Sequence, residues 1–139
     1  MTVHLLKIAV GVESVDHLAE LQAARKKRLG RIVHFTRHYP KRAGELLDGG
    51  SMFWIIKGLV RVRQRLIGFE HTKRDNDMPA CAIVLDQNLV RTQLQPRRPH
   101  QGWRYLEPAD APADAPRGAR GDDDLPPKMA EELRALGLL

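Results

Sequence analysis

Apolar residues near the start of the chain follow a strand pattern and then a helical one. Residues 3–10 (VHLLKIAV) form a mainly apolar run that predicts a buried strand. Beyond Ser14, a good helix N-cap, apolar residues recur at helical spacing as far as Gly30, a good helix stop. We therefore expect a helix over about residues 15–28, followed by a short strand over residues 32–36 (IVHFT).

The middle of the chain predicts a short helix and then a hairpin. KRAGELL, residues 41–47, is typical of a short helix, and the two glycines that follow Asp48 suit its C-cap and turn. MFWIIKG, residues 52–58, predicts a buried strand. ACAIVLD, residues 80–86, predicts another strand, which pairs with the run before it across the polar loop HTKRDND.

The run LVRVRQRLIGFE, residues 59–70, alternates with a period of two, as expected for a strand with two different faces. One predicted face is apolar apart from a glutamine, and the other is basic. The first face holds Val60, Val62, Gln64 and Leu66; the second holds Arg61, Arg63, Arg65 and Ile67.

The last third of the chain is less regular. QLQPRRPHQGWRYLEP predicts a loop or an edge segment, with a short strand around residues 103–106. Residues 108–124 are rich in Pro, Ala and Asp, without an apolar period, and predict a flexible linker. Residues 125–139 predict a short amphipathic helix that docks on the domain or on a partner.

These elements predict a single α+β domain over residues 1–107. Short strands outnumber helices, so we expect a small curved or barrel-like mixed β-sheet with two or three flanking helices and the C-terminal amphipathic helix. A length of 139 residues allows one domain with a true core.

Charge and cysteine content narrow the classes of function. Residues 31–104 carry fourteen Lys/Arg and six Asp/Glu, a net charge of +8, whereas residues 105–139 carry a net charge of −4. A basic segment of this kind favours a polyanion as partner. The single cysteine, Cys81, excludes an internal disulfide and favours the cytoplasm. The N-terminal apolar run is short and contains Lys7, so we expect neither a signal peptide nor a membrane span.

Four runs resemble a known family. They are TRHYPKRAGELLDGGSMFWIIKGLVRVRQRLIGF, AIVLDQNLVRTQ, PRRPHQGWRYL and the ending LPPKMAEELRALGLL. Together they resemble a bacterial family catalogued as domain of unknown function 1489, over nearly the whole chain. The resemblance implies no activity.

A weaker resemblance is to the PUA-like and ASCH-like superfamily of small β-barrels. In those proteins a short helix also ends in a glycine turn before a barrel strand, as ELLDGGS precedes MFWIIKG here. That resemblance implies RNA binding and, in some members, catalysis on modified nucleosides. It transfers no catalytic motif to this sequence.

Basic residues with interleaved aromatics form the candidate site. Arginine can fork onto phosphate, and aromatic rings can stack on unpaired bases. Trp54 lies in an apolar run that predicts a core position, so Trp103 is the better stacking candidate. The candidate nucleic-acid-binding residues are Arg37, Lys41, Arg42, Lys57, Arg61, Arg63, Arg65, Arg97, Arg98, Trp103 and Arg104.

Other chemistry has little support in the sequence. The six histidines are scattered and no second cysteine exists, so we expect no metal site and no cofactor. Cys81 lies in an apolar run typical of a buried thiol. The glycines of LLDGGS follow a helix, whereas a phosphate cradle needs glycines before one. We identify no catalytic residue.

Three hypotheses follow. The first is a non-catalytic module that binds RNA or another nucleic acid through the basic strand face and the Arg/Trp loop. The second is an enzyme acting on a modified nucleoside or nucleic acid, with Lys57 and Glu45 the first residues to test. The third is a protein-interaction or assembly module, as monomer or homodimer, that uses the C-terminal helix.

Overall fold

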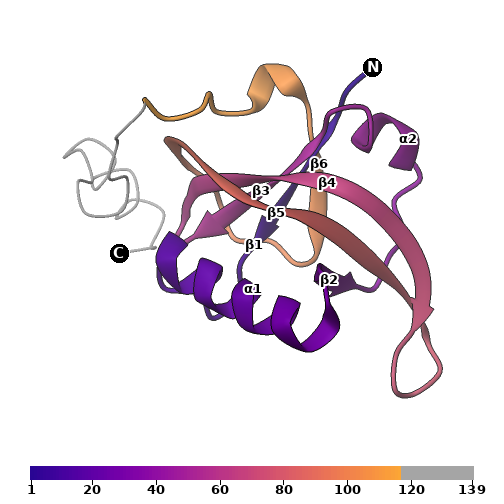
Figure 1. The fold of residues 1–139 in the computed structure, drawn as a ribbon. Coiled ribbons are helices and arrows are strands. Elements are labelled where there is room, and N and C mark those ends of the chain that lie inside the picture. The colour runs from indigo at the N-terminus through magenta and orange to yellow at the C-terminus, as the bar shows by residue number, and fades with distance from the viewer. Residues whose placement is uncertain (117–139) are drawn as a thin grey trace.

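The protein is described by a computed structural model over residues 1–116. This part of the chain contains a six-stranded mixed sheet in the order β2-β5-β4-β3-β1-β6, one long helix and one short helix (Figure 1). The strands are β1 (His4–Ile8), β2 (Ile32–Thr36), β3 (Ser51–Ile56), β4 (Leu59–Lys73), β5 (Pro79–Pro96) and β6 (Trp103–Leu106). The helices are α1 (Val15–Leu29), α2 (Ala43–Leu46) and the 3-10 helix η1 (Pro108–Asp110).

The sheet is mixed: β1 and β3 pair in parallel, and all the other neighbouring strands pair antiparallel. β4 and β5 form a long bent hairpin (Figure 1). In the described part of the chain the sheet is open, with β2 and β6 as its two edges. The α+β class and the mixed sheet are therefore confirmed, whereas closure into a barrel is not seen.

Helix α1 begins and ends where the sequence predicts. The hydroxyl of Ser14 accepts a hydrogen bond of 3.0 Å from the backbone N–H of His17. Gly30 has a φ of 81°, and its N–H donates to the carbonyl of Lys26 at 2.7 Å. Glycine takes this left-handed conformation without the steric cost that a Cβ would add, so the helix stops here.

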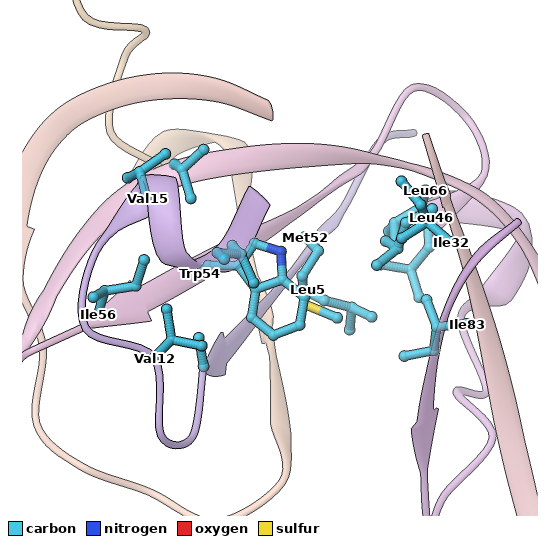
Figure 2. Close-up of a cluster of buried hydrophobic side chains, with 14 of the residues drawn as sticks. Leu5, Val12, Val15, Ile32, Leu46, Met52, Trp54, Ile56, Leu66 and Ile83 are labelled. Carbon is cyan, nitrogen blue, oxygen red and sulfur yellow. The ribbon is translucent and has the colours of Figure 1, made fainter. Parts of the chain in front are cut away.

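The main core lies between α1 and one face of the sheet (Figure 2). Trp54 is at its centre and only 2% exposed, as predicted for a core tryptophan. A second, smaller cluster on the opposite face of β1 and β3 includes Leu6, Phe53 and Leu106. Both faces of the central strands are therefore buried, which explains the nearly unbroken apolar run of β3.

A buried polar network replaces apolar contacts at the centre of this core. The Gln64 carboxamide exchanges two hydrogen bonds with Gln22, of 2.8 Å and 2.7 Å. Its oxygen also accepts from the Trp54 indole N–H at 3.1 Å, and its nitrogen donates to the Asp86 carbonyl at 2.6 Å. Gln64 is fully buried, so these partners offset the cost of desolvating an amide.

A bulge at Arg61 interrupts the predicted alternation of β4. Trp54 pairs with Val62, but the next residue of β3, Ile55, pairs with Val60, so β4 contains one extra residue. Val60 consequently packs in the smaller cluster and Val62 in the main core. The prediction that these two valines share a face was wrong, because a bulge shifts the period of two.

Gly50 allows two backbone segments to meet. A Cβ on Gly50 would collide with the carbonyl oxygens of Leu46 and Val3. Its N–H donates to the Leu46 carbonyl at 2.9 Å, which closes the turn after α2. The LLDGGS run is thus a helix end and a tight turn, as predicted.

The first part of the predicted linker lies against the sheet. Thr92 forms an isolated antiparallel bridge with Asp114, and the N–H of Gln93 donates to the Ala113 carbonyl at 2.8 Å. Residues 113–115 therefore pair locally with β5. The rest of the predicted linker and the predicted helix over residues 125–139 lie outside the described residues.

Candidate functional site

An open pocket of about 610 Å³ lies between the two edges of the sheet. One wall comes from the end of β2 and the residues after it, and the other from the start of β6. The tip of the β4–β5 hairpin contributes Arg74. The lining residues are Lys7, Phe35, Thr36, Arg37, His38, Arg74, Gln101, Gly102, Trp103 and Arg104, and we call this the seam pocket.

The strand register places Lys7 and Trp103 side by side in the seam pocket. Lys7 on β1 pairs directly with Trp103 on β6 in an antiparallel ladder. Directly paired residues of such a ladder project from the same face of the sheet. Leu5, two residues before Lys7 on the same strand, faces the main core. Residues two apart on a strand point to the same face, so Lys7 lies on the core-facing side of β1.

The lining of the seam pocket is basic. Lys7, Arg37, Arg74 and Arg104 line it, and no Asp or Glu does. Within residues 1–116, none of these four cations forms an ion pair. A concave surface lined by charges of one sign concentrates counter-ions, so the pocket is suited to an anion.

Lys7 is the least solvated of these cations. Its side chain is partly buried, and burial lowers the pKa of its ammonium group below the ordinary value of 10.5. The Nζ atom makes one long hydrogen bond of 3.4 Å to the carbonyl of Ile8. An ammonium group carries three protons, so Lys7 retains donor capacity for a ligand.

Aromatic rings accompany the cations. Trp103 is partly buried, its ring meets that of Tyr105 at 5.0 Å, and its indole N–H donates to the carbonyl of His38 at 3.2 Å. This bond ties β6 to the segment that follows β2. Phe35, on the opposite wall, is 55% exposed, which is unusual for a phenylalanine.

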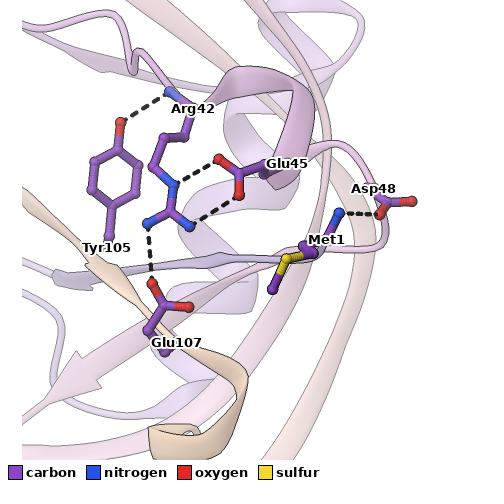
Figure 3. Close-up of polar contacts among 6 residues, drawn as sticks. All are labelled: Met1, Arg42, Glu45, Asp48, Tyr105 and Glu107. Carbon is purple, nitrogen blue, oxygen red and sulfur yellow. Dashed lines mark hydrogen bonds and ion pairs between the residues drawn. The ribbon is translucent and has the colours of Figure 1, made fainter.

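A second side-chain bridge joins the same segments beside the pocket. The backbone N–H of Arg42 donates to the Tyr105 hydroxyl at 3.1 Å, and the guanidinium of Arg42 lies 5.2 Å from the Tyr105 ring (Figure 3). The same guanidinium binds Glu45 at 2.7 Å and Glu107 at 3.0 Å. These carboxylates raise the pKa of Arg42 further above its ordinary value. The contacts of Arg42 therefore stabilise the fold, and its guanidinium already has protein partners.

Two arginines of the predicted basic strand face also have protein partners. Arg61 is only 8% exposed, and its Nε–H donates to the Ile56 carbonyl at 2.7 Å. Arg63 forms two hydrogen bonds to the Asp114 carboxylate, of 2.6 Å and 2.8 Å. The expected row of solvent-facing arginines is thus corrected: the bulge buries Arg61, and the segment after η1 covers Arg63.

The remaining predicted residues are spread over the surface. Lys57 lies in the β3–β4 turn and pairs with Glu13 at 3.0 Å, while Lys41 and Arg65 are exposed away from the seam pocket. Arg97 and Arg98 line a second pocket of about 550 Å³ on the other side of β6, which shares Arg104 with the seam pocket. Residues that line the seam pocket from the predicted set are Arg37, Trp103 and Arg104.

His34 lies near Lys7 and is kept neutral. Burial, together with the nearby charges of Lys7 and Arg25, lowers its pKa to about 4. Its ring meets the Trp54 ring edge-on at 5.1 Å, and its Nε2 has no hydrogen-bond partner within the described residues. Because the imidazole is neutral, it places no second positive charge next to the Lys7 ammonium group.

Thiol and metal chemistry find little support in the described part of the chain. The Cys81 thiol is buried, and burial raises its pKa, which disfavours the reactive thiolate. Within residues 1–116, no three His, Cys, Asp or Glu side chains gather closely enough to hold a metal ion. In the same part of the chain, no helix has the length and apolar character needed to cross a membrane.

Comparison with known proteins gives a family and nothing closer. The family model described as "Protein of unknown function (DUF1489)" matches residues 5–139. The chain belongs to the DUF1489 family. No curated protein and no solved structure matched the chain in the corresponding searches.

Several pocket residues of this DUF1489 member escaped prediction. Lys7, His38 and Arg74 come from three segments that are distant in sequence and come together only in the folded chain. Lys7 carried a usable signal, because it is the one charged residue in an otherwise apolar strand. A charge at such a position requires either a partner or a solvent-filled pocket.

Proposed function

We propose that this protein binds single-stranded nucleic acid, RNA in the first instance, through the seam pocket and its rim. The observation that carries the proposal is a pocket lined by four cations and two aromatic rings, with no carboxylate in its lining. Single-stranded nucleic acids are recognised by this combination, because bases stack on rings while cations neutralise phosphates.

The two kinds of group have suitable positions for this task. Arg37 and Arg74 are exposed at the rim, where the flexible phosphate backbone of a strand can reach them. Phe35 and Trp103 lie on opposite walls, so an unpaired base that enters meets an aromatic surface. A duplex does not present unpaired bases, so the proposal is specific for single strands.

The neighbouring surface extends the basic rim. A second opening of about 600 Å³ shares Phe35, Thr36 and Arg74 with the seam pocket and adds Lys73 beside Asp75. A strand longer than one nucleotide can therefore continue along the tip of the β4–β5 hairpin. The interface proposed from sequence, on Arg61 to Arg65, is replaced by this one.

We also propose that the fold is related to PUA-like barrels. The support is local: two side-chain hydrogen bonds, Trp103 to His38 and Arg42 to Tyr105, bridge β6 and the segment after β2. The bridges bring the two sheet edges close without pairing them.

We further propose that the protein is located in the cytoplasm, because a lone thiol such as Cys81 stays reduced there.

Charge reversal at the rim tests the RNA proposal. The variant Arg37→Glu/Arg74→Glu should bind a single-stranded RNA pool at least about tenfold more weakly, and the slope of log affinity against log salt should fall by roughly 1 to 1.5. The control Lys27→Glu/Arg28→Glu makes the same charge change on exposed residues of α1 and should bind nearly as the wild type does. Equal losses in both variants, or in neither, would refute the proposal.

One observation favours a second candidate function, catalysis on a nucleoside or nucleic acid. The pocket contains a lysine whose pKa burial lowers, and such lysines serve as bases or nucleophiles. Lys7 therefore replaces the solvent-exposed Lys57 and the ion-paired Glu45 as the residue to test. Incubation with RNA and mixed modified nucleosides, followed by mass spectrometry, should show no Lys7-dependent product if binding is the whole function.

A further inference from the structure

We infer that the seam pocket takes a phosphate monoester: the terminal phosphate of a single strand, at its 5′ or 3′ end, or the phosphate of a free mononucleotide. The inference rests on the proposed function and names the ligand group that the pocket itself receives. It gives two parts of the site different roles: the cations of the rim bind the strand, and Lys7 binds the phosphate at the end of the strand.

Lys7 differs from the rim cations in its surroundings. Arg37, Arg74 and Arg104 are exposed, whereas Lys7 is partly buried next to Trp103. Its one hydrogen bond in the described chain, to the Ile8 carbonyl, is long at 3.4 Å. A desolvated cation with unused donors gains most from a ligand that brings a compact, concentrated negative charge.

A terminal phosphate brings more charge to Lys7 than a backbone phosphate does. A phosphate monoester carries about −1.5 to −2 charges near neutral pH and has three strong acceptor oxygens. A phosphodiester inside a strand carries a single charge and is flanked by two sugars, which keep it near the rim. A strand end can place a phosphate against Lys7 while the adjoining nucleotide contacts Trp103.

The groups around Lys7 oppose neither the charge nor the entry of such a ligand. His34 is held neutral by its burial, and no carboxylate lines the pocket. Arg104 lies beside the entrance, with its guanidinium held by the carbonyls of Gln101 and Trp103 at 2.8 Å and 3.1 Å. The volume of about 610 Å³ is within the usual range for a pocket that encloses a small ligand.

The test compares RNA ends in the full chain. One single-stranded RNA sequence with an internal fluorophore is prepared with a 5′-phosphate, with a 3′-phosphate and with two hydroxyl ends. At least one phosphorylated form should bind about tenfold or more tightly than the hydroxyl form, because charged hydrogen bonds to the terminal group are added. A free nucleoside monophosphate should compete better than the nucleoside.

Two matched variants locate the preference. Lys7→Met keeps the apolar stem and removes the charge, and it should bind the phosphorylated and the hydroxyl-ended RNAs with equal affinity. Lys73→Met makes the same change in the neighbouring opening and should keep the preference. Equal binding of all three RNAs by the wild type would overturn the inference and leave the proposed function standing. If none of the RNAs binds, the proposed function itself fails.

A measurement on the wild-type chain guards against misfolding of the Lys7 variant. Inorganic phosphate added to the protein should raise the pKa of the Lys7 ammonium group, followed by NMR of its side chain, because a bound anion favours the charged form. Sodium chloride at equal ionic strength should leave it nearly unchanged. The same pKa in both salts would contradict phosphate binding at Lys7.

Discussion

Lys7 and Trp103 are paired across β1 and β6, and both side chains line the pocket between the two edges of the sheet. The pairing joins a partly desolvated cation and an aromatic ring whose N–H holds the opposite wall at His38. It provides, in one register position, the two groups that a nucleotide requires: one for its phosphate and one for its base.

Replacing Trp103 should weaken RNA binding without unfolding the domain. Trp103→Leu keeps an apolar side chain but loses the stacking surface and the bond to His38. We expect a loss of about 1–3 kcal/mol in binding free energy, the usual range for one stacked base, measured by fluorescence anisotropy. Tyr39→Leu is the control, because Tyr39 stacks on His71 at 4.0 Å and does not line the pocket. A larger loss for Tyr39→Leu would contradict this assignment.

Gln64→Leu should destabilise the fold strongly although it adds an apolar residue to the core. The change leaves Gln22 and the Trp54 indole without their buried partner. We expect the free energy of unfolding to fall by about 2–4 kcal/mol, measured by urea denaturation. Adding Gln22→Leu should recover part of that loss, because one unsatisfied amide is then removed. No recovery in the double variant would show that the network is not the cause.

Gly50→Ala should be among the most damaging single-methyl changes in the chain. Its Cβ would meet two backbone carbonyl groups, of Leu46 and Val3, which cannot move aside as a side chain can. We expect a loss of about 3 kcal/mol or more in the free energy of unfolding. Gly44→Ala is the matched control: a Cβ there meets nothing within 4 Å, so stability should be unchanged or slightly higher. Similar melting temperatures for the two variants would contradict the close approach.

His34 should make the fold sensitive to mild acid. Its pKa is about 4 in the fold and near 6.5 when unfolded, so the unfolded state binds the extra proton between these values. The stability that the neutral ring contributes is complete above the unfolded value and is lost as pH falls toward the folded one. Between about pH 7 and about pH 5 this loss should amount to about 2 kcal/mol.

His34→Phe isolates that contribution. His4 also has a pKa lowered by burial and acts in the same direction, so the wild type and the variant must be compared at each pH. The variant should have a shallower pH dependence of the free energy of unfolding over this interval. Parallel curves would show that folding does not lower the pKa of His34.

The sequence predicts elements better than it predicts partners. Ser14 and Gly30 fix the ends of α1 through local chemistry, so their roles could be read directly. Arg61 could not be read in this way, because a one-residue bulge changes which face it joins and buries it. Gln64 lies on the core-facing side of β4 as predicted, but its partner Gln22 could not be identified from the sequence, because it lies on α1, 42 residues away.

The candidate site was only partly predictable. Trp103 and Arg104 were identified because cations and aromatics are adjacent in that segment. Arg74 and His38 were missed because their proximity to Trp103 depends on the bend of the β4–β5 hairpin and the approach of the sheet edges. Charge along the chain predicted a class of partner, whereas the proposed place of binding depends on the tertiary structure.

Mapping a bound single-stranded RNA onto the protein shows whether the seam pocket is the binding site. Backbone amide shifts of the full chain can be followed by NMR during titration with a single-stranded RNA at moderate salt. We expect the largest changes at residues 35–38, 73–75 and 101–104, around the seam pocket. Changes centred on Arg61 to Arg65, or on the exposed face of α1, with the seam pocket unaffected, would contradict it.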